Sequence, residues 1–257
     1  MDKSGSRKHE NYELLNMIGY GLAKFNEEFV KQFGFKSKTD FYKYLVKLGV
    51  GDTASTIKNR QDLLDPFFDN GRRGWWQRKD QWVSRKLFID SLFGNEDVVS
   101  FVKIVKMYLQ KDFKADIGEE MQVSPLLKSR FKALQETGQE AEFYFLHNYQ
   151  SVPVFQNGII EDARNFGDGY DFQVVKDSNY LLAEVKGVKT DIGSIRMTKN
   201  EFEKAREYEN DYFLVVVSNL IEVPKITPIE NPVKQLKLTE NKIVSTQINY
   251  HSAAIKW

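Results

Sequence analysis

The chain has 257 residues, of which 41% are hydrophobic and 28% charged, and this composition is typical of a globular protein that buries one or two cores. It contains no cysteine, which excludes disulfides, zinc ribbons, iron–sulfur clusters and thiol nucleophiles. The net charge of +1 does not by itself indicate a polyanionic partner.

The amino-terminal segment and the histidines narrow the class of protein further. The segment MDKSGSRKHE is polar where a signal peptide would be apolar, and no run of about eighteen apolar residues occurs. We therefore expect a cytoplasmic protein without a membrane span. The histidines, His9, His147 and His251, are too far apart for a local zinc motif, and no Gly-x-Ser-x-Gly nucleophile elbow is present. Any hydrolysis would depend on carboxylates, lysine and a hard metal ion.

In the first half of the chain, apolar residues recur every three or four positions, which predicts amphipathic helices. Ser37 or Thr39 would cap the second of these helices. Asp52 or Thr53 would begin the third, and Pro66 would end it. The strongest helical patterns lie at 14–29, 41–48, 57–63, 82–92 and 98–109.

The second half of the chain adds strands. The polar segment 114–122 is predicted to connect the two parts, and a helix over 125–148 is predicted to bend at 137–138. Thr198 and Glu201 form a capping-box pair that would begin a further helix. We therefore expect a mixed α/β fold, with a helical N-terminal region before a C-terminal mixed β-sheet flanked by helices. Short apolar runs bounded by turn residues predict strands at 171–175, 180–186 and 212–218.

The strand YLLAEVK over 180–186 carries the residues of greatest chemical interest. Because side chains alternate along a strand, Glu184 and Lys186 share one face while their neighbours face the other way. Asp171 begins the preceding strand, and a short turn at 177–179 would lay the two strands side by side. The sequence therefore predicts two carboxylates and one ammonium converging on one site.

This set of groups suits phosphodiester hydrolysis. Asp171 and Glu184 would hold Mg²⁺, which prefers oxygen ligands and retains several waters. The metal would activate water and draw charge from the phosphate. Lys186 would stabilise the transition state electrostatically. As a general base it would need a pKa well below its usual value of about 10.4, whereas neighbouring carboxylates raise it.

The Glu-x-Lys pattern alone is not specific. A second copy, formed by Glu240 and Lys242, lies in a polar segment with no partner acid. An exposed cross-strand charge pair would also explain Glu184 and Lys186 without any chemistry. The apolar character of the strand, the upstream Asp171 in GDGYD and the glycine that follows the lysine favour the catalytic interpretation.

The stretch from about Gly138 to Val223 contains, in order, GQEAE, GDGYDFQV, YLLAEVKG, RMTKNEFEKA and YFLVVVSN. These motifs resemble the PD-(D/E)XK nuclease superfamily. Within it they are similar to the small nuclease-like domain at the C-terminus of "NO VEIN" proteins and in several restriction enzymes. The resemblance implies a mixed sheet flanked by helices, dependence on Mg²⁺ with Mn²⁺ as a substitute, and nucleic acid as substrate.

The resemblance also implies roles for individual residues. It places the two catalytic acids on Asp171 and Glu184, which would be the metal ligands, and the catalytic lysine on Lys186. Tyr170 stands where the superfamily usually has a proline before the first acid, a departure that is common within it.

A further acid is implied on the helix that precedes the sheet. It falls on Glu142, for which a solvated helix face is an equally good explanation, and Glu140 is the less favoured candidate. Thr198, Asn200 and Glu201 also match the family, but helix capping and packing explain them without chemistry.

In the helical half, the stretch GRRGWWQRKDQW mixes basic and aromatic residues, which suits phosphate contacts combined with stacking. The helix before it offers polar side chains of the kind that read bases in a groove. The alternative is that Trp75 and Trp82 belong to a core and that the arginines form a solvated face. The predicted DNA-binding residues are Arg72, Arg73, Trp76, Arg78, Lys79, Lys58, Asn59 and Arg60.

These observations lead to the hypothesis of a type II restriction enzyme, a sequence-specific and Mg²⁺-dependent endonuclease that cuts double-stranded DNA. Residues 1–115 would form a helical DNA-recognition domain, and residues 116–257 a nuclease domain. Two alternatives stay open: a catalytically inactive, nuclease-like module that only binds nucleic acid, and a structure-selective repair nuclease. From its class we expect a homodimer, and a cognate DNA methyltransferase in the same system.

Overall fold

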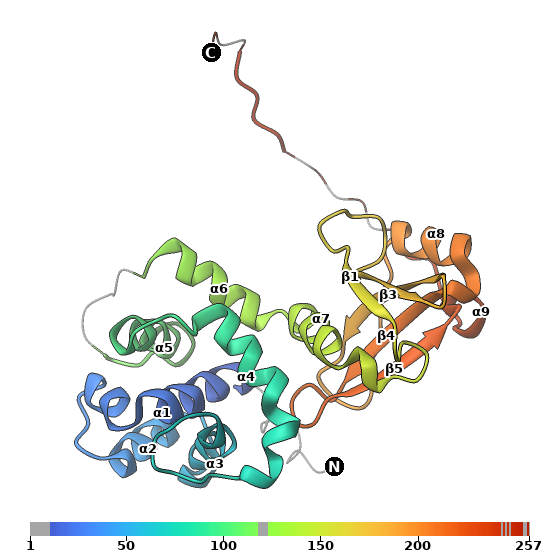
Figure 1. Ribbon diagram of the computed structural model, residues 1–257. Helices are drawn as coiled ribbons and strands as arrows, with labels where there is room; N and C mark the ends of the chain where they lie inside the picture. The colour runs from blue at the N-terminus through green and yellow to red at the C-terminus, as the bar shows by residue number, and fades with distance from the viewer. Residues whose placement is uncertain are drawn as a thin grey trace, which may run out of the picture.

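The structure is a computed structural model that describes residues 11–117 and 123–242, together with residues 244, 246, 248–253 and 256. The polar segment 1–10 and part of the predicted connection, residues 118–122, lie outside the described residues. In the described part, helices precede a mixed five-stranded sheet that is flanked by further helices (Figure 1). The predicted mixed α/β class is confirmed. No helix within these described ranges is long and apolar enough to cross a membrane.

The N-terminal helices begin where the sequence supplies caps. The side chain of Ser37 accepts a hydrogen bond from the Asp40 amide, and that of Thr53 accepts one from the Thr56 amide, so these two predicted caps are confirmed. The fourth helix begins at Lys79, before the predicted start at Trp82, because its first turn is polar and has no apolar spacing. The helices are α1 (Tyr12–Gln32), α2 (Lys38–Lys47), α3 (Ala54–Leu64), α4 (Lys79–Phe93) and α5 (Val98–Phe113).

The main hydrophobic core lies among these helices and extends beyond residue 115. Phe131 and Leu134 of α6 (Pro125–Gln135) are buried in the same core as residues of α1 and α5. The chain leaves the helical conformation at Glu136, and α7 (Thr137–Asn148) follows, which confirms the predicted interruption. Helix α6 therefore packs with the helical part, while the position of the domain boundary stays a prediction.

The sheet has the strand order β1-β2-β3-β4-β5 within the described residues. Strands β3 and β4 are parallel and the other neighbours are antiparallel. Asp177 and Ser178 both have positive φ, the backbone of a tight hairpin turn, so the predicted turn between β2 and β3 is confirmed. The strands are β1 (Ile159–Asp162), β2 (Phe172–Lys176), β3 (Asn179–Gly187), β4 (Tyr212–Ser218) and β5 (Lys225–Glu230).

Two of these strands were not predicted from the sequence, and both lie at the edges of the sheet. Strand β1 is mostly exposed, so it lacks the alternation of apolar and polar residues that marks a half-buried strand. Strand β5 contains Pro228, a residue that argues against a central strand and is tolerated at an edge. The three predicted strands are confirmed as β2, β3 and β4, the centre of the sheet.

Helices cover both faces of the sheet. Ala141 and Phe145 of α7 pack on one face, against Phe172 and Val185. The other face is covered by α8 (Lys199–Tyr208), which joins β3 to β4, and by α9 (Pro232–Gln235). In Figure 1, α7 lies between the helical part and the sheet, and α8 and α9 lie on the far side of the sheet.

A buried polar network joins the helical part to α7 and the sheet part. The side chain of Arg85, 4% exposed, donates from Nε to Glu140 Oε1 at 3.1 Å. The same guanidinium also donates to the carbonyls of Leu220 and Glu222, and it lies over the Trp82 ring at 4.4 Å. The Tyr12 hydroxyl donates to Glu140 at 2.9 Å. Arg85 and Glu140 thus connect α1 and α4 of the helical part to α7 and to the loop after β4.

Candidate active site

The structure brings Asp171, Glu184 and Lys186 together at the end of the β2–β3 ladder. The last antiparallel pair is Phe172 with Ala183, and the Asp171 amide still donates to the Ala183 carbonyl at 3.0 Å. Because Ala183 is already paired with Phe172, this bond keeps the chain before β2 against β3 at the end of the ladder. The Asp171 carboxylate also accepts a hydrogen bond from the Val185 amide at 2.8 Å. The Asp171 charge also raises the pKa of Glu184, so the two acids lie near each other at this end of the ladder.

The loop before Asp171 is fixed by helix α8 and strand β4. Gly169 has a φ of +84°, and a Cβ added there would lie 2.8 Å from the Asn200 carbonyl oxygen, so only glycine fits. The Tyr212 hydroxyl donates to the Gly169 carbonyl at 2.8 Å, and the Asn200 side chain donates to the Gly167 carbonyl at 2.7 Å. Gly169 thus allows the close contact with α8 that holds the loop before Asp171 in place.

Lys186 lies between two carboxylates. Its Nζ is 2.5 Å from Glu184 Oε1 on the same strand and 3.0 Å from Glu201 Oε2 on α8. The Glu184 side chain is 6% exposed and the Lys186 side chain 22%, so the carboxylate is enclosed while the ammonium borders solvent. The sequence explained Glu201 by capping alone. Its contact with Lys186 joins segments that are distant in sequence, and no local pattern signals it.

Burial and mutual charge shift the pKa values of these groups. Burial raises the pKa of Asp171 to about 6, although the hydrogen bond from Val185 opposes the shift. Burial and the neighbouring Asp171 charge raise the pKa of Glu184 to about 8. Burial would lower the pKa of Lys186, but Glu184 and Glu201 outweigh it and raise the pKa above its usual range. The site therefore favours a protonated lysine and holds carboxylates that are costly to ionise without a further cation.

These shifts predict a stability that falls as pH rises. In the unfolded chain the two carboxyls titrate near pH 4, at about 3.9 for Asp and 4.3 for Glu. Their raised pKa values in the folded state stabilise the protein fully below that pH, and this contribution is lost as pH rises through about 6 and then about 8. In EDTA, the melting temperature should therefore drop between pH 5.5 and pH 8.5.

The matched variant for this measurement is Glu184→Gln, which keeps the shape of the side chain and removes its ionisation. Its melting temperature should fall less over the same pH interval, as followed by circular dichroism. If the two proteins lose the same number of degrees, Glu184 does not ionise against burial.

Glu142 and Glu140 lie in different surroundings on helix α7. Glu142 Oε2 is 3.1 Å from Arg164 Nη1, and the same arginine also pairs with Asp162. Burial raises the pKa of Glu142, and its charge in turn raises the pKa of Asp171, so it borders the site. Glu140 instead binds Tyr12 and Arg85. Of the two acids considered from the sequence, Glu142 is the one near the site.

The donor set fits a hard divalent cation. Two carboxylates, Asp171 and Glu184, share a partly enclosed position, and the charge of one raises the pKa of the other. Mg²⁺ is usually held by one or two carboxylates, with waters completing its octahedron. Residues 11–117 and 123–242 contain no group of three or more His, Cys, Asp or Glu side chains placed to hold a metal ion. A cation here would accordingly have few protein ligands.

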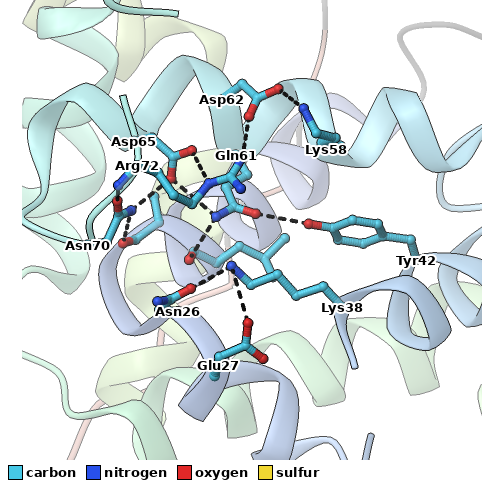
Figure 2. A network of polar contacts seen from close by, with 12 residues as sticks. Asn26, Glu27, Lys38, Tyr42, Lys58, Gln61, Asp62, Asp65, Asn70 and Arg72 are labelled. Carbon is cyan, nitrogen blue, oxygen red and sulfur yellow. Dashed lines mark hydrogen bonds and ion pairs between the residues drawn. The ribbon is translucent and has the colours of Figure 1, made fainter. Parts of the chain in front are cut away.

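In the helical part, Arg72 and Lys58 bind carboxylates of the protein itself. Arg72 Nη2 is 2.6 Å from Asp62 and its Nε is 2.7 Å from Asp65, and both carboxylates are buried (Figure 2). Lys58 also pairs with Asp62, at 2.6 Å, with its side chain half exposed. Figure 2 shows Asn70 in the same network, where its side chain donates to Asp65 at 2.8 Å. Arg72 thus fastens the loop after Asn70 to α3.

The remaining predicted DNA-binding residues divide into two groups. Arg60 is largely enclosed between the rings of Tyr12 and Trp82, and burial lowers its pKa to about 10. Trp82 lies in the core and Trp75 packs against it, as the alternative interpretation of these tryptophans predicts. Asn59 of α3 is half-buried. The exposed group consists of Arg73, Trp76, Arg78 and Lys79, and we call it the basic surface.

The basic surface combines cations with aromatic rings. Arg73 lies 4.7 Å from the centroid of the Trp76 ring, and Arg78 lies 5.4 Å from that of Trp75. Trp76 is 49% exposed, an unusual position for the largest apolar side chain. The Trp75 amide donates to the Asp62 carbonyl at 2.6 Å, so the backbone just before Trp76 is anchored to α3.

Comparison with known proteins bears on the sheet part of the chain. Residues 141–229 match the family model described as "Protein NO VEIN, C-terminal". The match runs from α7 into β5, so it contains the whole candidate site and leaves out the helical part. No curated protein and no solved structure matches the chain. The likeness of this segment to the C-terminal domain of NO VEIN proteins is confirmed, and the wider superfamily stays a prediction.

Proposed function

We propose that this chain is a Mg²⁺-dependent nuclease of the PD-(D/E)XK type that hydrolyses DNA. The observation that carries the proposal is the enclosed pair of carboxylates, Asp171 and Glu184, with the ammonium of Lys186 beside it at the border with solvent. Carboxylates that are costly to ionise, next to a cation that stays protonated, occur at functional sites more often than in ordinary surface ion pairs. The exposed charge pair that the sequence left open as an alternative does not fit a glutamate side chain that is 6% exposed.

The residues of the site divide the work of hydrolysis between them. Asp171 and Glu184 would hold the metal ion. When bound, the cation lowers the pKa of water and draws charge from a phosphate. Lys186 keeps its proton because the neighbouring carboxylates raise its pKa, so its ammonium donates to a phosphate oxygen and offsets the charge that develops there. Glu142, at the border of the site, adds negative charge that attracts the cation.

At a finer level, we propose a sequence-specific type II restriction enzyme in which the helical part contacts DNA. The support is the basic surface, which has three exposed cations and an exposed tryptophan, with one of the cations, Arg73, over the tryptophan ring. Guanidinium and ammonium groups bind phosphates, and an exposed ring can stack on or insert between bases. A two-fold dimer would match a palindromic site, as is usual for enzymes that cut both strands.

Digestion of a supercoiled plasmid tests this proposal. With Mg²⁺ the chain should convert the plasmid to linear fragments of discrete sizes, and with EDTA it should leave the plasmid intact. Methylated and unmethylated copies should be compared, because cleavage of one copy alone would point to a restriction system. Binding without cleavage in Mg²⁺ or Mn²⁺ would favour an inactive binding module. Cleavage only at flaps or junctions would favour a repair nuclease.

We expect Arg73→Ala, Arg78→Ala and Lys79→Ala each to weaken DNA binding. A cation that contacts a phosphate releases counterions, so each loss should reduce the slope of log K against log salt concentration by about 1. Fluorescence anisotropy with a labelled duplex at several KCl concentrations measures both quantities.

Two further variants serve as controls for the basic surface. Lys111→Ala removes an exposed lysine from α5 and should leave the slope unchanged. Arg72→Ala should lower the melting temperature, because it leaves two buried carboxylates without this partner. Weaker DNA binding by Arg72→Ala at an unchanged melting temperature would instead show that Arg72 reaches the DNA.

A further inference from the structure

The ammonium of Lys186 is shared between two carboxylates that come from different elements. Glu184 lies two residues away on β3, and Glu201 lies in the first turn of α8, which packs on the sheet. The Glu201 side chain is 13% exposed, so its ion pair is largely shielded from water. Both contacts of Lys186 are therefore strong, and the position of the ammonium depends on their balance.

Glu201 is held in place by the helix cap that it forms. Its Oε2 accepts a hydrogen bond from the Thr198 amide at 2.9 Å, and its own amide donates to Thr198 Oγ1 at 3.3 Å. The same Oε2 is the atom 3.0 Å from Lys186. A capping box satisfies two amides at the start of a helix, and here it also fixes the carboxylate that faces the lysine.

Lys186 and a metal ion compete for Glu184. An ammonium paired with Glu184 alone would neutralise that carboxylate and weaken its attraction for a second cation. Glu201 accepts part of the hydrogen bonding of the ammonium. Glu184 can therefore bind a metal ion while Lys186 keeps a carboxylate partner. Lysine has three donors, so it can remain beside the site while it binds Glu201.

We propose that Glu201 is a positioning residue that holds Lys186 and thereby makes Glu184 available to a divalent cation. This inference rests on the proposed function, since it concerns the same metal site. It assigns to α8 a role beyond packing: its N-terminal turn sets the lysine through Glu201 and the loop of Asp171 through Asn200. The N-terminal turn of α8 thus contacts both Lys186 and the loop before Asp171.

Mn²⁺ binding to the full chain without DNA, measured by isothermal titration calorimetry, tests the proposal. Glu201→Gln keeps an acceptor for the helix cap and removes the charge that holds Lys186. We expect it to weaken Mn²⁺ binding about tenfold to a hundredfold, the usual effect of losing a partner behind a metal ligand. Thr198→Ala removes the cap hydroxyl and keeps the carboxylate, so it should lower the melting temperature and change the Mn²⁺ affinity less than about twofold.

The same substitution in a Lys186→Met background separates positioning from simple charge. If Glu201 acts through Lys186, adding Glu201→Gln to Lys186→Met should cause little further change in Mn²⁺ affinity. An equal loss in both backgrounds would mean that Glu201 only attracts cations at a distance, and it would overturn the proposal. So would an unchanged affinity of the single Glu201→Gln variant.

Cleavage measured on the same proteins keeps this inference distinct from the proposed function. If the chain binds Mn²⁺ but cuts no DNA, the nuclease proposal fails while the calorimetry still decides the role of Glu201. If the chain cuts DNA, Glu201→Gln should lower kcat and leave the DNA affinity unchanged. Wild-type kcat in Glu201→Gln would count against the positioning role and leave the nuclease proposal intact.

Discussion

Lys186→Ala should slow Mg²⁺-dependent DNA cleavage by about a hundredfold to a thousandfold, the loss expected when one donor to a developing negative charge is removed. DNA affinity should stay the same, because the basic surface that we propose to bind DNA lies in another part of the chain. Single-turnover nicking of supercoiled plasmid gives the rate, and anisotropy with Ca²⁺ in place of Mg²⁺ gives the affinity. The effect is large because Lys186 is the ammonium beside both metal-binding candidates.

The chain supplies its own matched control for this variant. Glu240 and Lys242 repeat the Glu-x-Lys spacing, but their side chains are 77% and 85% exposed. Lys242→Ala should therefore cut DNA at the wild-type rate. Cleavage that survives Lys186→Ala, or that is lost equally in both variants, would contradict the assignment of the active site.

Arg85→Met should lower the free energy of unfolding by about 3–5 kcal/mol, the usual cost of removing one partner from a buried ion pair. The methionine retains much of the packing on Trp82 but leaves the Glu140 carboxylate without its guanidinium. The carbonyls of Leu220 and Glu222 lose donors as well. Urea denaturation followed by tryptophan fluorescence measures the change.

A second substitution shows whether the loss comes from the uncompensated charge. Adding Glu140→Leu should restore a large part of the stability, because apolar replacements of a whole buried pair are often neutral. Tyr12 keeps a partner in the double variant, since its hydroxyl also donates to the Leu220 carbonyl. Arg78→Ala, an exposed arginine of the same segment, should change stability by less than about 1 kcal/mol. The variant Glu140→Leu alone is measured as well. If the loss of unfolding free energy in the double variant equals the sum of the losses in the two single variants, the uncompensated-charge explanation is wrong.

The centre of the fold and of the site could be predicted because their signals are local. Strands β2, β3 and β4 are short apolar runs, and the period of two along β3 places Glu184 and Lys186 on one face. The tight turn at Asp177 then brings β2 back beside β3, so that Asp171 lies at the end of their ladder. The edge strands carry no such pattern, since one is mostly exposed and the other contains a proline.

The partners of the basic residues could not be predicted, because they come from distant segments. Within GRRGWWQRKDQW and the residues after it, Arg72 and Arg85 look no different from Arg73. Arg72 meets carboxylates of α3, and Arg85 meets Glu140 of α7, so both are used inside the protein. The role of Glu201 was missed for the same reason: its local capping pattern is complete without the contact to Lys186.

The place of α7 has a consequence for anyone who wants to exchange the recognition part of this chain. At Gly187 an added Cβ would lie 2.4 Å from the Thr137 carbonyl, so the start of α7 is seated directly on the strand that carries Lys186. One turn further along α7, Glu140 forms an ion pair with Arg85. A chimera in which another DNA-recognition domain is fused to the sheet must therefore provide a replacement for Arg85, or carry a substitution of Glu140.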